Sequence, residues 1–117
     1  MGRLTTHVLD TASGKPGSSI RFELVRLAAN NSREAYSFVT NADGRCDQPL
    51  LQDETFKMGT YELIFHVAEY FRRQQLLLPD PPFLDQVVIR FGIADAAQHY
   101  HVPLLISPWS YSTYRGS

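Results

Sequence analysis

Four side chains suited to proton transfer and to holding a polar ligand lie where the sequence directs them away from a protein core. His99 and His101 belong to a run in which every second side chain is apolar, so both point to the opposite face. His7 lies opposite to the apolar side chains of its own run. Arg45 follows an Asp-Gly turn, from which a long basic side chain reaches past a sheet edge. Imidazoles with an ordinary pKa of about 6.5 exchange protons at neutral pH, and a guanidinium grips two acceptors at once.

Each of these residues also has an ordinary structural explanation. A lone histidine on a strand is usually a surface or hydrogen-bonded residue, and an arginine after a turn is most often a solvated charge. The spacing of His99 and His101 also fits a metal site, but no cysteine or acidic cluster joins them, so zinc is a minor interpretation. We expect Cys46 to be a small, partly buried residue at a strand start and His66 to fill a strand face.

The end of the chain carries a second group of functional side chains. From Trp109 apolar and polar residues alternate, which is typical of a strand. Such a strand delivers a phenol, a guanidinium, a flexible glycine and a free carboxylate to one place, from Tyr114, Arg115, Gly116 and Ser117. We therefore expect these last four residues to be held in place rather than frayed.

Short strands must position these residues. Alternation predicts strands at residues 4–10, 20–27, 34–40, 61–67, 87–93, 99–106 and 109–114, seven or eight in all. A turn is expected at 41–44, and the one helical candidate, 69–76, ends before a proline cluster. Pro103 suits an edge strand, or a strand that stops pairing there. Many short strands with Gly and Pro turns and one short helix indicate an all-β sandwich of two sheets.

The side chains that this alternation directs inward share apolar character. They are Leu4, Val8, Ile20, Phe22, Leu24, Tyr36, Phe38, Tyr61, Leu63, Phe65, Val67, Val87, Ile89, Phe91, Ile93, Tyr100, Val102, Leu104 and Ile106.

Length and composition favour one domain, residues 1–117, that works on a small molecule or a protein partner. The hydrophobic fraction of 44% is that of a soluble globular protein, and no apolar run is long enough to span a membrane. A net charge of −1 gives no basis for capturing nucleic acid or acidic lipid. The N-terminus lacks the apolar core of a secretory signal, and Cys46 has no partner for an intramolecular disulfide. We expect a reducing, cytoplasmic location.

Several motifs together carry a family resemblance over nearly the whole chain. In chain order they are Thr6 to Asp10, Gly14 to Pro16, Asp43 to Arg45, Tyr70 with Phe71, His99 to Leu105, Ser107 with Pro108, and Tyr111 to Ser117. They resemble the transthyretin-like family in its 5-hydroxyisourate hydrolase branch. The terminal Tyr-Arg-Gly-Ser, behind upstream motifs in the right order, is the specific part. Trp109 and Ser110 stand where that branch more often has Tyr and Gly.

The resemblance implies a fold, an assembly and a reaction. The fold is an eight-stranded transthyretin-like sandwich with one short helix, assembled as a homotetramer, a dimer of dimers with active sites in a central channel. The reaction is hydrolysis of 5-hydroxyisourate to 2-oxo-4-hydroxy-4-carboxy-5-ureidoimidazoline in urate degradation to allantoin, with no metal or organic cofactor. The implied catalytic residues are His7, Arg45, His101 and Ser117; the substrate-binding residues are His7, Arg45, Tyr114, Arg115 and Gly116; and His99 is a supporting residue.

Alternatives remain at the level of mechanism and of class. Direct attack by water fits better than a nucleophilic Ser117, because a negative carboxylate on the same residue disfavours a developing alkoxide. The sequence does not decide which of His7 and His101 acts as base and which as acid.

A carrier with the same fold would bind a small molecule without catalysis, since fold alone does not fix function. An interaction module with no small ligand would leave the outward histidines unexplained. A peroxisomal location stays open for a eukaryotic source, but the final Arg-Gly-Ser is not a Ser-Lys-Leu peroxisomal signal.

Overall fold

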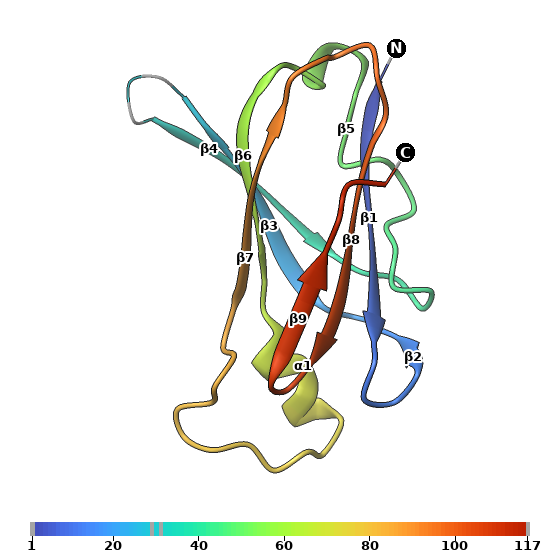
Figure 1. The fold of residues 1–117 in the computed structure, drawn as a ribbon, viewed down its shortest axis with the longest axis vertical. Helices are drawn as coiled ribbons and strands as arrows, with labels where there is room; N and C mark the ends of the chain where they lie inside the picture. Colours follow the sequence, from blue (N-terminus) through green and yellow to red (C-terminus); the bar gives the residue numbers. More distant parts are fainter. Residues whose placement is uncertain (1, 29, 31, 117) are drawn as a thin grey trace.

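Two β-sheets pack face to face, with one short helix near one end of the sandwich (Figure 1). The computed structural model describes residues 2–28, 30 and 32–116. The described elements, in chain order, are β1 (Arg3–Asp10), β2 (Lys15–Pro16), β3 (Arg21–Leu27), β4 (Arg33–Val39), β5 (Leu51–Gln52), the 3-10 helix η1 (Asp53–Thr55), β6 (Gly59–Phe65), α1 (Val67–Arg73), β7 (Val87–Ile93), β8 (Tyr100–Ser107) and β9 (Ser110–Thr113). The predicted all-β sandwich is confirmed; β2 and β5 have only two residues each.

The sheets bring the two ends of the chain together. One sheet has the order β2-β1-β8-β9, with β5 also paired to β1, and the other has the order β4-β3-β6-β7. Strands β1 and β8 run parallel, and the other described pairs are antiparallel. Their register sets Leu4 beside Tyr100 and Asp10 beside Ile106, so strands from opposite ends of the sequence lie side by side (Figure 1).

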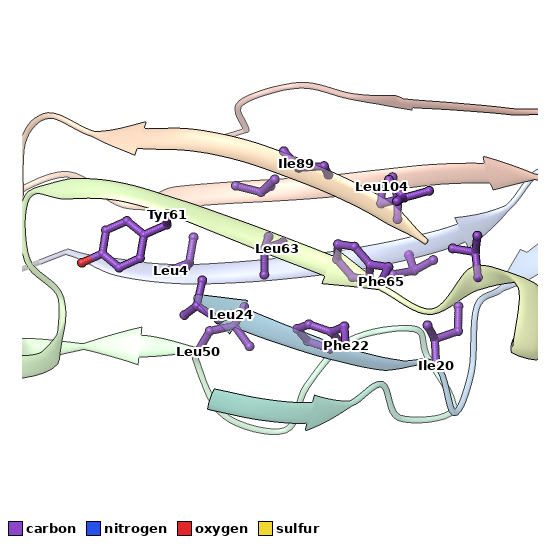
Figure 2. Close-up of a cluster of buried hydrophobic side chains, with 14 of the residues drawn as sticks. Leu4, Ile20, Phe22, Leu24, Leu50, Tyr61, Leu63, Phe65, Ile89 and Leu104 are labelled. Atoms are coloured by element: carbon purple, nitrogen blue, oxygen red, sulfur yellow. The ribbon is translucent and has the colours of Figure 1, made fainter. Parts of the chain in front are cut away.

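The core lies between the sheets and is built from the alternate residues that the sequence directs inward. Figure 2 shows side chains of both sheets meeting there, with Leu4 and Leu104 from one sheet and Leu63 from the other. Burial of each such side chain contributes about 1.5–3 kcal/mol. Most of the expected inward residues are buried, but Tyr36 on the edge strand β4 is 40% exposed.

The helix begins earlier than its sequence predicted. Strand β6 ends at Phe65, and α1 occupies Val67–Arg73 rather than residues 69–76. Val67 is buried, as expected, but as the first residue of the helix and not the last of a strand. The helix cannot continue to residue 76, because Gln75 has a left-handed φ of 64°. No helix in the described part of the chain has the length and apolar character needed to cross a membrane.

Pro103 lies within a central strand, so the expectation of an edge strand is wrong. It nevertheless marks a break in pairing on one side. The β8–β9 ladder ends with Leu104 beside Thr113 and resumes as a single bridge between His101 and Gly116. Proline has no N–H to donate to a ladder. Its carbonyl still accepts a hydrogen bond, from the hydroxyl of Thr113 at 2.6 Å. Pairing with β1 continues past Pro103 without interruption.

Candidate active site

The outward side chains of β1 and β8 form one surface, which we call the histidine face. Its members are Thr5, His7 and Leu9 of β1 and His101, Pro103 and Leu105 of β8. The parallel register sets Thr5 beside His101 and His7 beside Pro103. Both histidines are half-buried, and His99 lies exposed just before β8. The prediction that three histidines lie off the core is confirmed.

A cleft of about 370 Å³ opens at one end of the histidine face. Its lining residues are Arg3, Thr5, Thr6, Arg45, Cys46, His99, Tyr100 and His101. The structure thus brings together three of the residues expected in the site: Arg45, His99 and His101. His7 is not part of the lining, but its charge acts on His101.

His101 is held from two sides and its pKa is lowered. The hydroxyl oxygen of Thr5 lies 2.8 Å from Nδ1 of its ring. On the other side its backbone exchanges two hydrogen bonds with Gly116, at 2.6 and 3.3 Å. Burial lowers the pKa of His101 below its ordinary value of 6.5, and the positive charges of Arg45 and His7 lower it further. The neutral imidazole therefore predominates at pH 7 and is able to accept a proton.

Arg45 owes its position to a turn docked on β1. The Asn41 side chain accepts hydrogen bonds from the backbone N–H groups of Asp43 and Arg45, at 2.9 and 3.1 Å. The Gly44 carbonyl then accepts the N–H of Val8, at 2.8 Å. Gly44 has a φ of +76°, and a Cβ there would lie 2.3 Å from the Val8 carbonyl oxygen. Only glycine fits this contact, which places the next residue, Arg45, at the cleft.

The described part of the tail is held in place. The Arg115 guanidinium donates to Oε1 of Gln98 at 3.0 Å and to the His99 carbonyl at 3.1 Å. It also stacks over the Tyr100 ring, 4.3 Å from the centroid. Gly116 packs so closely on His101 that a Cβ would lie 3.0 Å from the imidazole ring. The tail therefore supports the histidine from the β9 side.

Tyr114 and Arg115 do not line the histidine cleft within one copy of the chain. They line a second hollow of about 280 Å³, between β7 and β9, together with Ile89 and Phe91. The Tyr114 side chain is 62% exposed. Ser117 lies outside the described residues.

The sequence was compared with those of known protein families. A model of the HIUase/Transthyretin family matches residues 4–116.

The chain belongs to the HIUase/Transthyretin family.

Three known proteins illustrate the range of similarity to this chain. The 5-hydroxyisourate hydrolase of Pseudomonas aeruginosa is 60% identical over 117 residues, which cover all of this chain and 93% of the relative. The crystal structure of (S)-allantoin synthase superposes with a TM-score of 0.94 at 47% identity, covering 99% of this chain; this chain spans 44% of that one. Sea bream transthyretin in complex with thyroxine has a TM-score of 0.86 at 26% identity, covering 97% of this chain and 94% of that one.

Arg3 and Thr5 line this cleft, although the sequence did not indicate either as a site residue. Both share the alternation of His7, so their outward direction was readable. Their place beside His99 and His101 was not, because it depends on parallel pairing between the ends of the chain.

Two further expectations concern residues beside the site. Cys46 lies in a loop and not at a strand start, half-buried, with a pKa raised by burial and by Asp47. His66 does not fill a strand face: it stands between β6 and α1, and its Nε2 bonds the Glu23 carboxylate at 2.8 and 2.9 Å. Within the described residues no three His, Cys, Asp or Glu side chains gather in a metal-binding arrangement.

Proposed function

We propose that this chain hydrolyses 5-hydroxyisourate to 2-oxo-4-hydroxy-4-carboxy-5-ureidoimidazoline, a step in urate degradation to allantoin. The observation that carries the proposal is one cleft lined by the His101 imidazole, with its lowered pKa, and the Arg45 guanidinium. The Pseudomonas aeruginosa relative, 60% identical, is named 5-hydroxyisourate hydrolase. The chain is accordingly an enzyme of the cyclic amide hydrolase class.

Ring opening adds water across a cyclic amide bond. The water oxygen bonds to the carbonyl carbon, the carbon–nitrogen bond breaks, the nitrogen takes a proton, and the new carboxylic acid ionises. We assign His101 as the base that takes a proton from water, because its neutral ring is the form that accepts one. His7 is the second proton carrier and returns a proton to the departing nitrogen. The positive charges of Arg45 and His7 lower the pKa of His101, which favours His101 rather than His7 as the base.

Arg45 orients the planar substrate. Its guanidinium donates to two acceptors in the plane of the substrate. It also offsets the negative charge that grows on the attacked carbonyl oxygen. His99 supports the site through its carbonyl, which accepts from Arg115. Ser117 follows Gly116. Its hydroxyl and carboxylate position the water or stabilise one tautomer of a histidine.

Tyr114, Arg115 and Gly116 complete the substrate site in a homotetramer, a dimer of dimers. The support for this assembly is that β7 and β9 are both edge strands, paired on one side only within the described chain. Exposed aromatic side chains lie on β9 and in the turn before it: Tyr111 is 45% exposed and Trp109 60%. Analytical ultracentrifugation at micromolar concentration should report four times the chain mass of 13.3 kDa.

We place this activity in the cytoplasm. The support is the single cysteine, which has no partner for an intramolecular disulfide. Fractionation of the source cells should recover the activity with cytoplasmic markers.

The test of function is the ultraviolet decay of 5-hydroxyisourate, generated freshly from urate with urate oxidase. The substrate also decays unaided, so only acceleration by the protein counts. We expect clear acceleration by the wild-type chain and a loss of about 100-fold or more in His101→Asn and in Arg45→Gln. Absence of acceleration from a folded tetramer would reject the proposal.

The carrier alternative is not favoured. Transthyretin shares the fold at 26% identity, whereas relatives at 44–60% identity are named 5-hydroxyisourate hydrolases.

A further inference from the structure

Arg3 brings a second guanidinium to the histidine cleft. It is the first residue of β1, exposed to solvent, and it lines the same cleft as Arg45 and His101. The parallel register, extended back by one residue from Leu4, sets Arg3 level with His99. Arg3 therefore shares the outward face of β1 with Thr5 and His7.

The backbone that carries Arg3 is fixed. Gly2 is buried, and its N–H donates to the Ala96 carbonyl at 3.1 Å. A Cβ on Gly2 would lie 2.2 Å from the Gln98 carbonyl oxygen and 2.3 Å from the Phe56 ring. The next residue, Arg3, pairs with Gln52 of β5. Close packing around Gly2 and the pairing with β5 therefore fix the backbone position of Arg3 beside the cleft.

The charged side chains that line the cleft among the described residues are all positive. They are the guanidinium groups of Arg3 and Arg45, and no Asp or Glu belongs to the lining. Among the described residues, no carboxylate lies within 4.0 Å of the guanidinium of Arg3 or Arg45. The whole chain has a net charge of −1, so this concentration of positive charge does not reflect composition. Such a cleft raises the local concentration of anions.

Hydrolysis creates an anion where the substrate had a cyclic amide. The product carries a carboxylate and a ureido group that the closed ring lacks. We propose that Arg3 binds this new carboxylate, so that the cleft is specific for ureido carboxylic acids on its product side. A guanidinium matches a carboxylate with two parallel N–H···O bonds, which the ammonium of lysine cannot form. This assignment rests on the proposed hydrolysis, and it gives the two arginines separate tasks: Arg45 on the closed ring and Arg3 on the opened one.

A stable pair of probes tests the inference. N-carbamoylglycine carries a ureido group and a carboxylate, and N-carbamoylglycinamide replaces that carboxylate by a neutral amide. Their inhibition constants are measured against 5-hydroxyisourate hydrolysis, and their binding to the wild-type tetramer is measured by calorimetry. The variants are Arg3→Gln, Arg3→Lys and, as a control of equal charge change, Arg72→Gln on the exposed end of α1.

The wild type should bind the carboxylate at least about 10-fold more tightly than the amide. That preference should fall about 5- to 10-fold in Arg3→Gln, fall less in Arg3→Lys, and persist in Arg72→Gln. Equal binding of the two probes by the wild type would overturn the inference without any variant. So would an unchanged preference in Arg3→Gln, or an equal loss in Arg72→Gln, which would assign the effect to net charge. If the wild type does not accelerate substrate decay, the proposed function is rejected instead. The calorimetric comparison of the two probes needs no turnover, so it tests the role of Arg3 separately.

Discussion

The hydroxyl oxygen of Thr5 lies 2.8 Å from Nδ1 of His101, and the two residues are 96 positions apart in the sequence. The contact fixes the ring against β1 and leaves Nε2 as the nitrogen available for proton transfer. A hydroxyl can both donate and accept, so it holds the ring in either tautomer and through protonation.

Thr5→Val keeps the side-chain shape and removes this bond. We expect the turnover number to fall about 10-fold and the free energy of unfolding to fall by about 1 kcal/mol or less, because the pair is partly buried. Steady-state kinetics and urea unfolding measure the two effects. Thr5→Ser restores the hydroxyl and should recover most of the rate; a fully active Thr5→Val would show that the bond has no part in catalysis.

The lowered pKa of His101 predicts the acid side of the pH profile. The neutral, active ring is lost as pH falls through a pKa below 6.5, so kcat/KM should reach half of its plateau value only below pH 6.5. Arg45→Gln removes one positive charge that lowers this pKa, so the decline should move to higher pH while the rate falls. NMR titration of the His101 ring reports the same shift directly. An unmoved titration in Arg45→Gln would rule out the assigned electrostatic contact.

The same pKa has a consequence for stability. Folding lowers the pKa of His101, so below about pH 6.5 the unfolded chain binds the proton more readily than the folded one. This residue therefore costs no stability above pH 6.5, and stability declines as pH falls through that value towards the folded pKa. His101→Asn should lessen that decline, as measured by thermal melts at pH 7.5 and 5.5.

Gly44→Ala should displace Arg45. The new Cβ would meet the Val8 carbonyl at 2.3 Å in a backbone with φ +76°, so the turn must leave β1. We expect a loss of about 2–4 kcal/mol in unfolding free energy and a loss of activity. Gly14→Ala is the matched control, because Gly14 has a φ of +73° but nothing within 4 Å of an added Cβ. It should cost about 1 kcal/mol and leave the rate unchanged. Similar activities in the two variants would contradict the role of the Gly44 contact.

Deletion of residues 114–117 should abolish activity and leave a folded, β-rich protein. The deletion removes the backbone pair between Gly116 and His101 and the Arg115 contacts, but it leaves the core intact. Circular dichroism should be near that of the full chain, with a melting temperature lower by about 5 °C. Full activity in the shortened chain would remove the tail from the site.

Local pattern predicted which way the side chains face. Period-2 alternation sets side-chain direction within a strand, so the outward position of His101 and the inward position of Val102 were readable from the sequence. The Asn-Ala-Asp-Gly turn before Arg45 was readable for a similar reason, since these residues tolerate the dihedrals of a tight reversal.

Contacts between distant strands were not readable. Alternation places Thr5 outward but does not say that β1 runs parallel to β8, which is what sets it beside His101. The helix start was missed because burial of Val67 fits a strand and a helix equally well, and only packing decides between them. The docking of Gly44 on Val8 likewise depends on two segments that no local signal connects.

The parallel pairing of β1 with β8 also dictates when the enzyme becomes competent. A ribosome releases β1 early and β8 only after all the elements between them have been made. From the synthesis of Arg45 until that of β8, the nascent chain carries His7 and Arg45 but lacks His101. Closing so long a loop is slow, because its entropic cost precedes any gain from the contacts formed. The site therefore cannot form before β8 has been synthesised.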